Sequence, residues 1–194
     1  MVRRSGARRP NLAERGLRVK KVPGDGNCLF AALSDKLCGS PICHTQIRAT
    51  VVSHLRQNRQ HFASFVEEDE PQRRRTLRST TSAACQEPKD RFEKYLSSMS
   101  LSGTSGGHLE LQAFCDAFAR MVIVYDTSTK KSGGDEITER VFTPQVGDTA
   151  VVKSSLRIVF SGDGEKEGHY DSTQSENGGG EIEEPLHHSA YTRA

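Results

Sequence analysis

The sequence predicts an α+β domain, with a small β-sheet packed between helices, and three observations support this prediction. Apolar residues recur every three or four positions in several stretches, as on the buried face of a helix. Shorter runs rich in β-branched residues lie among those stretches, as expected of buried strands. Helical stretches precede most of these runs, which argues against a regular βαβ repeat. The 194 residues suffice for one domain with tails.

The first predicted elements are a short strand and a helix joined by a tight turn. Residues 17–22 carry the apolar side chains of the strand, and Pro-Gly-Asp-Gly at 23–26 forms the turn. Asn27 is a residue type favoured at helix N-caps, and apolar residues repeat with helical spacing from Leu29 to Leu37. A helix is therefore expected to begin directly after Asn27.

A second helix is predicted over residues 44–61. Its apolar stripe consists of residues four positions apart, Ile47, Val51 and Leu55. Its arginines are expected largely on the other face: Arg48, Arg56 and Arg59.

The remaining elements are two helices and three strands. A short helix is predicted near residues 89–99, the glycine-rich stretch 103–107 interrupts the chain, and a longer helix covers 111–118. The apolar run at 121–125 suits a buried strand. Two further strands are predicted, at 139–143 and 156–161.

The chain divides into a flexible basic leader at 1–16, a folded domain at 17–172 and a disordered tail at 173–194. Residues 71–88 are interpreted as an insertion loop, because they are rich in Arg, Ser and Thr and show no periodicity. The leader lacks the aromatic residues that stack on bases, so we favour a solvated arm over one that binds nucleic acid. A nuclear-targeting or nucleic-acid-binding arm is the alternative.

The composition of the chain indicates where in the cell the protein is located. No apolar run approaches the roughly 20 residues that span a bilayer, and no apolar stretch follows the basic N-terminal residues as in a secretory signal. The 5 cysteines form no regular framework. We therefore expect a monomer without membrane association, located inside the cell in the cytoplasm or nucleus, where thiols stay reduced.

Cys28 is the candidate nucleophile. It lies in the first turn of the predicted helix, where backbone N–H groups are unpaired and the helix dipole is positive. Both effects favour a thiolate, and the same N–H groups could hold the oxyanion formed when a carbonyl is attacked. Gly24 and Gly26 leave room for a substrate backbone. The alternative is a buried structural cysteine, which is the commoner role of a lone thiol.

His169 is the candidate base. A cysteine near the start of the domain and a histidine near its end follow the chain order of papain-like enzymes. Asp171 lies two residues later, on the same side of an extended segment, where its carboxylate can reach the ring and fix its tautomer. A loop histidine without a role is the alternative.

Neither a metal nor another cofactor is expected. The residues that could bind zinc have no paired C-x-x-C spacing and no convincing fourth ligand: Cys38, Cys43 and His44, with Cys85 and His108 as remote additions. The glycines at 103–107 and 162–164 match neither a P-loop nor a dinucleotide-binding fingerprint.

Four segments in order carry a family resemblance: 22–33 around Cys28, 95–107, 108–125, and 168–172 around His169. They resemble the motifs of the OTU (ovarian tumour) deubiquitinases, which are papain-like cysteine proteases. The resemblance spans residues 17–172 and implies the fold of that family. It also implies hydrolysis of the isopeptide bond at the C-terminal glycine of ubiquitin. The implied partners are ubiquitin, polyubiquitin chains and ubiquitinated proteins.

The resemblance assigns roles to the candidate residues. Cys28 would form the thioester, His169 would act as base and then acid, and Asp171 would orient His169. It also marks Asp25 of the cysteine loop. We interpret Asp25 as a residue that holds the turn, because a carboxylate aimed at the thiolate would disfavour the thiolate charge.

The resemblance further implies that glycine-rich loops line a channel for the ubiquitin tail. The residues expected to contact this tail are Gly24, Gly26, Asn27, Gly103, Thr104, Ser105, Gly106, Gly107 and Tyr170. Acidic side chains, among them Glu110 and the run 67–70, could meet basic residues of the tail, although a solvated loop is the simpler interpretation of the run.

Ser105 stands where the family usually has an aromatic residue. This departure leaves open an OTU fold that binds ubiquitin and cuts it poorly. The complete set of Cys28, His169 and Asp171 argues against such a module, since a pure binder does not need all three. A thiol hydrolase acting on another ubiquitin-like modifier also remains open.

Overall fold

The computed structural model describes residues 11–68, 88–128, 137–145, 155–162 and 168–176. In these ranges the α-helices are α1 (Cys28–Cys38), α2 (His44–Gln57), α3 (Arg59–Glu68), α4 (Pro88–Met99) and α5 (His108–Phe118). Two short 3-10 helices are η1 (Ala13–Arg15) and η2 (Pro41–Cys43). The strands are β1 (Leu17–Lys20), β2 (Met121–Asp126), β3 (Thr138–Phe142), β4 (Ser155–Ser161) and β5 (His169–Ser175).

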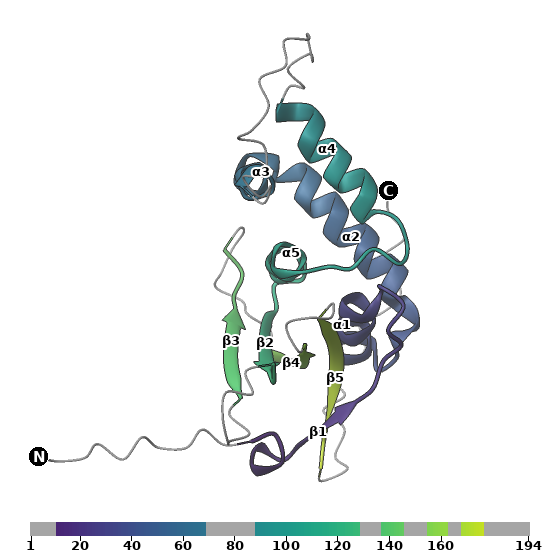
Figure 1. Ribbon diagram of the computed structural model, residues 1–194, viewed down its shortest axis with the longest axis vertical. Coiled ribbons are helices and arrows are strands. Elements are labelled where there is room, and N and C mark those ends of the chain that lie inside the picture. Colours follow the sequence, from purple (N-terminus) through teal and green to yellow (C-terminus); the bar gives the residue numbers. More distant parts are fainter. Residues whose placement is uncertain (1–10, 69–87, 129–136, 146–154, 163–167, 177–194) are drawn as a thin grey trace, which may run out of the picture.

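The strands form one sheet in the order β1-β5-β4-β2-β3 (Figure 1). β2 and β4 run parallel, and the other neighbouring strands run antiparallel. Because side chains alternate along a strand, Val122 and Val124 of β2 lie in the main core, and Ile123 and Tyr125 face the other side. β5, which begins with His169, lies inside the sheet between β1 and β4.

The helices cover one face of this sheet. α1 contacts β5 and β4, α5 contacts β2 and β3, and α2 packs against both helices (Figure 1). Apolar side chains from these helices fill the core: Leu29, Phe30, Leu33, Val51, Leu55, Leu111 and Phe114. The prediction of an α+β domain is therefore confirmed. No helix in the described ranges is both long and apolar enough to cross a membrane.

A smaller apolar cluster covers the other face of the sheet. It consists of Tyr125, Ile137 and Val159, with Leu12, Leu17 and Ile123 packed against them. Arg15 of η1 adds to this cover, because its guanidinium lies 5.1 Å from the centroid of the Tyr125 ring and its Nη1 lies 3.0 Å from Glu139 Oε2. Residues 11–16, predicted as part of the leader, thus belong to the fold.

The predicted helix over 44–61 is in fact two helices, α2 and α3, divided at Asn58. The Asn58 backbone (φ −106°, ψ 35°) leaves the helical region, and its side-chain Nδ2 donates to the His54 carbonyl at 3.0 Å. Arg48 was also placed wrongly, because it is buried. It precedes the buried Val52 by one helical turn and so shares the inward face.

β5 was not predicted as a strand. It pairs with β1 over 172–175 and with β4 over 169–172. Ser172 and Thr173 are buried, so ordered structure continues past the predicted boundary at 172. The rest of the predicted leader and tail, and the insertion loop up to residue 87, lie outside the described residues.

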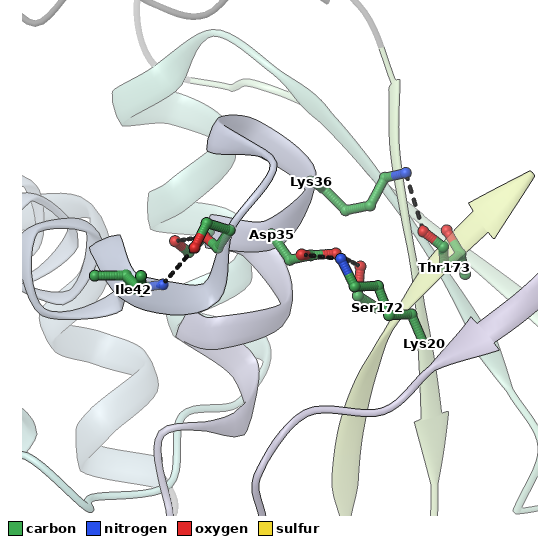
Figure 2. Close-up of polar contacts among 8 residues, drawn as sticks. Lys20, Asp35, Lys36, Ile42, Ser172 and Thr173 are labelled. Carbon is green, nitrogen blue, oxygen red and sulfur yellow. Dashed lines mark hydrogen bonds and ion pairs between the residues drawn. The ribbon is translucent and has the colours of Figure 1, made fainter. Parts of the chain in front are cut away.

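Polar contacts hold α1 against β5 (Figure 2). The buried carboxylate of Asp35 on α1 accepts a hydrogen bond from Ser172 Oγ at 2.6 Å and one from Lys20 Nζ at 2.7 Å. Lys36 Nζ donates to the carbonyl of Thr173 at 3.2 Å. The helix that begins with Cys28 is therefore fixed against the strand that begins with His169.

Candidate active site

Cys28 is the first residue of α1 and is buried. The turn before it is held by Asp25, whose Oδ1 accepts a hydrogen bond from the Asn27 N–H at 2.9 Å. Hydrogen bonds from Asn27 lower the pKa of the exposed Asp25 carboxyl, because they stabilise its charge. The N–H groups of the first helical turn have no acceptor within the helix, so the loop offers donors to a developing oxyanion beside the thiol.

His169 is oriented by Asp171. The ring Nε2 lies 3.2 Å from Asp171 Oδ1. A carboxylate only accepts hydrogen bonds, so Nε2 is the donor and Nδ1 is left as the basic nitrogen. A Cβ built on Gly24 would lie 3.6 Å from Nδ1, so this nitrogen lies beside the loop that leads to Cys28. The structure thus brings the predicted base to the cysteine loop.

Asp171 is 1% exposed and has further donors. Its Oδ1 accepts from the Val22 N–H at 3.2 Å, and its Oδ2 accepts from Lys21 Nζ at 2.7 Å. The sequence alone did not indicate a role for Lys21. Its contact with Asp171 arises because the end of β1 lies next to β5 in the sheet. These contacts hold the Asp171 carboxylate in place, and the carboxylate in turn orients the His169 ring.

The glycine-rich stretch 103–107 lies against the cysteine loop. A Cβ on Gly26 would lie 1.8 Å from the carbonyl oxygen of Gly103, and both glycines have positive φ, +77° and +86°. A Cβ on Gly106 would lie 2.8 Å from Leu29 Cδ2, so this glycine permits close packing on α1. The two predicted loops therefore touch through backbone that only glycine accommodates.

The residues predicted to contact substrate fall into two groups. Gly24, Gly103 and Ser105 are exposed at the site, and Gly26, Thr104, Gly106 and Gly107 are partly buried. Asn27 and Tyr170 are buried to the same extent as Cys28, and their role as substrate contacts stays a prediction.

Asn27 and Tyr170 support the site from within. Asn27 is the N-cap residue of α1, as predicted, but its side chain makes no cap hydrogen bond to the helix. Its Oδ1 instead accepts a hydrogen bond from the Gly103 N–H at 2.9 Å. The Tyr170 ring packs on Phe160 at 4.9 Å between centroids. Burial, and then the charge of Cys28, raise the pKa of Tyr170 to about 12.

Glu110, which the sequence suggested as a contact for basic residues of the ubiquitin tail, is buried and bonded within the domain. It is 2% exposed on α5. Its Oε2 accepts from the Gly107 N–H at 2.7 Å, and its Oε1 accepts from the Tyr95 hydroxyl. Glu110 therefore caps α5 and joins it to α4.

Arg48 of α2 is a second site residue, after Lys21, that the sequence prediction missed. Its guanidinium contacts both the cysteine loop and the stretch 103–107. The sequence feature that could have indicated its burial is its position one helical turn before Val52, on the buried face of α2. Among the described residues, no group of three or more His, Cys, Asp or Glu side chains could hold a metal ion.

Comparisons with known proteins identify the family and the fold of this chain. Residues 23–170 match the family model for OTU-like cysteine protease. The OVARIAN TUMOR DOMAIN-containing deubiquitinating enzyme 12 of Arabidopsis thaliana is 35% identical over 107 residues, which cover 55% of this chain and 39% of that protein. The solved OTU domain of OTUD1 gives a TM-score of 0.61 at 19% identity, over 84% of this chain and 89% of that chain.

A second solved structure, the Hazara virus OTU bound to ubiquitin, gives a TM-score of 0.52 at 17% identity, over 82% of this chain and 81% of that chain. The solved structures confirm the fold that the resemblance implied. The curated relatives are longer proteins, and the chain spans between 11% and 39% of the length of four of them.

Proposed function

Because this chain belongs to the OTU-like cysteine protease family, we propose that it is a deubiquitinase that cleaves isopeptide bonds at the C-terminal glycine of ubiquitin. One observation carries the proposal. The Asp171 carboxylate holds His169 through Nε2, and Nδ1 lies beside the loop that leads to Cys28 at the start of α1. This is the arrangement that a thiol hydrolase needs, since it supplies a nucleophile, an oriented base and oxyanion donors together.

In the first half of the proposed reaction, His169 Nδ1 takes the proton of Cys28. The thiolate attacks the carbonyl carbon of the isopeptide, and N–H groups at the start of α1 receive the oxyanion. As the carbon–nitrogen bond breaks, His169 returns the proton to the leaving lysine amine. The products are a free amine and a thioester on Cys28.

In the second half, water replaces the amine. His169 takes one proton from the water as its oxygen attacks the thioester carbon, and the carbon–sulfur bond then breaks. His169 returns that proton to the departing Cys28 sulfur, and the freed carboxylic acid loses its own proton to solvent. Asp171 stays ionised throughout, because its task is to hold the ring and stabilise the imidazolium. No metal is needed for these steps.

Ubiquitin is the proposed substrate on two grounds. The name of the Arabidopsis relative is that of a deubiquitinating enzyme, and the Hazara virus OTU was solved with ubiquitin bound. The second ground is that Gly24 of the cysteine loop and Gly103 of the neighbouring stretch are both exposed, so two glycines are available to a substrate beside Cys28. A tail that ends in two glycines suits such a surface, because neither partner carries a Cβ.

The test is turnover of ubiquitin carrying a fluorogenic amide at its C-terminus, measured beside Cys28→Ala and His169→Gln. We expect turnover by the wild-type chain, and a loss of at least about 10²-fold in each variant. The corresponding C-terminal amides of ubiquitin-like modifiers should be cleaved more slowly than the ubiquitin amide. A folded wild type that binds ubiquitin without turning it over would contradict the proposed hydrolysis and favour a binding module.

A further inference from the structure

Arg48 lies where the proposed site meets its supporting helices. It is 3% exposed, although an arginine is seldom fully buried without partners. Its Nη1 donates to the Met99 carbonyl at 2.9 Å, where α4 ends. Its Nη2 donates to the Thr104 carbonyl at 2.8 Å, inside the stretch 103–107. The guanidinium therefore holds the start of the loop that lies against the cysteine loop.

The same guanidinium holds the cysteine loop. Nη2 also donates to Asn27 Oδ1 at 2.9 Å and to the Gly26 carbonyl at 3.3 Å. The plane of the group lies over the Phe30 ring of α1, with Cζ 4.1 Å from the centroid. Asn27 Oδ1 accepts from the Gly103 N–H as well. Arg48, Asn27 and the two loops thus form one hydrogen-bonded unit.

We propose that Arg48 is a positioning residue that fixes the cysteine loop relative to the stretch 103–107 and so sets the reactive arrangement around Cys28. The proposal rests on the proposed function. Neither loop has the ladder of a helix or strand to hold it, and both contain glycines with positive φ. A planar group with several donors can hold both at once, which a lysine ammonium cannot do with the same geometry.

The charge of Arg48 gives a second effect. Burial lowers the pKa of its guanidinium, and the charges of Glu110, Asp25 and Cys28 act in the opposite direction. An arginine remains protonated under either influence. Its hydrogen bonds to the two loops are therefore charge-assisted, so removal of this charge should loosen both loops.

The experiment compares Arg48→Lys, which keeps the charge and loses the planar fork, with Arg48→Met, which loses both. Arg56→Met is the matched control, because Arg56 lies on the same helix with its side chain 54% exposed. Two readouts are needed. One is the rate of Cys28 alkylation by iodoacetamide across a range of pH, located by peptide mass. The other is kcat and KM on the ubiquitin C-terminal amide.

We expect Arg48→Met to change the rate of Cys28 alkylation by about 10-fold at every pH, because the cysteine loop is no longer held in place. Arg48→Lys should lose about 10-fold or more in kcat/KM, because one ammonium cannot hold the two loops together in the same geometry. Asn27→Ala removes the shared acceptor and should act non-additively with Arg48→Lys. Arg56→Met should match the wild type in both readouts.

Other outcomes would overturn the proposal. If folded Arg48→Lys keeps the wild-type kcat/KM, or if the Arg48 variants lose only thermal stability, Arg48 has a purely structural role. If Arg48→Met does not fold, Arg48→Lys and Asn27→Ala still decide the matter. A wild type whose alkylation depends on Arg48, but which does not turn over ubiquitin, would support the effect on Cys28 and contradict the proposed substrate.

Discussion

At the scale of single residues, the site depends on how one carboxylate is surrounded. Asp171 receives hydrogen bonds from the Val22 N–H, the Lys21 ammonium and His169 Nε2. The first two donors come from the chain just after β1, and the third comes from β5 itself. Since the carboxylate cannot rotate without losing several of them, the tautomer and the direction of the His169 ring follow from its position.

Asp171→Asn should lower kcat on a ubiquitin C-terminal amide by about 10²-fold or more, because a neutral amide neither selects the tautomer nor stabilises the imidazolium. The control is Glu176→Gln, the same change at the exposed end of β5, where Oε1 lies 3.1 Å from Arg18 Nε. The control should keep wild-type kcat. An Asp171→Asn variant with more than half of the wild-type kcat would contradict the assigned role.

At the scale of elements, the contact between the two glycine-rich loops is the most restrictive packing in the site. Gly26→Ala would put a Cβ 1.8 Å from the Gly103 carbonyl oxygen, at a φ of +77°. The loops must separate, so we expect a loss of stability together with a fall of about 10²-fold in kcat/KM.

Gly39→Ala is the matched control for this change. Gly39 has a φ of +71°, but a Cβ there would meet nothing within 4 Å. It should cost about 1–2 kcal/mol from the backbone alone and leave kcat/KM unchanged. Urea unfolding and steady-state kinetics on both variants separate the two effects. Equal kinetics in the two variants would show that the loop contact is not needed for activity.

The polar contacts between α1 and β5 are a second feature at the scale of elements (Figure 2). Asp35→Asn and Ser172→Ala each remove part of the 2.6 Å hydrogen bond between Ser172 Oγ and Asp35 Oδ2. Each should lower the free energy of unfolding by about 1–3 kcal/mol, because a buried polar partner is left behind. The double variant should cost less than the sum of the single ones. Strict additivity in denaturant unfolding would argue that the two side chains do not interact.

The elements that could be predicted from sequence are those with local signals. The turn at 23–26, the start of α1 and the apolar run of β2 all depend on neighbouring residues. β5 escaped prediction because its buried polar residues are satisfied by distant partners, as Asp35 satisfies Ser172. Arg48 was misplaced for the same reason, since carbonyl groups from separate segments make its burial possible.

At the scale of the whole molecule, a buried thiol and a buried phenol should make the folded state less stable at alkaline pH. Burial raises the pKa of Cys115 from 9.0 to about 12, and burial with the Cys28 charge raises that of Tyr170 from 10.0 to about 12. Above pH 9 the unfolded chain releases these protons before the native chain does. Stability is therefore complete below pH 9 and is lost as pH rises toward 12.

Urea unfolding should show this loss as a fall of about 4 kcal/mol in the free energy of unfolding between roughly pH 8 and pH 11. Cys115→Val and Tyr170→Phe keep the approximate volume and remove one titrating group each. Each variant should lose less stability over the same range than the wild type does. Identical pH dependence in all three proteins would contradict the link to these two side chains.

The proposal that Cys28 attacks the tail of ubiquitin is tested most directly by the intact mass of the protein after reaction with ubiquitin that carries a thiol-reactive group at its C-terminus. We predict one adduct, located on Cys28 and formed while Cys38 and Cys43 remain unmodified. It should be absent in Cys28→Ala and slow in His169→Gln. A well-folded wild type that forms no adduct, or one that forms it on another cysteine, would contradict the account.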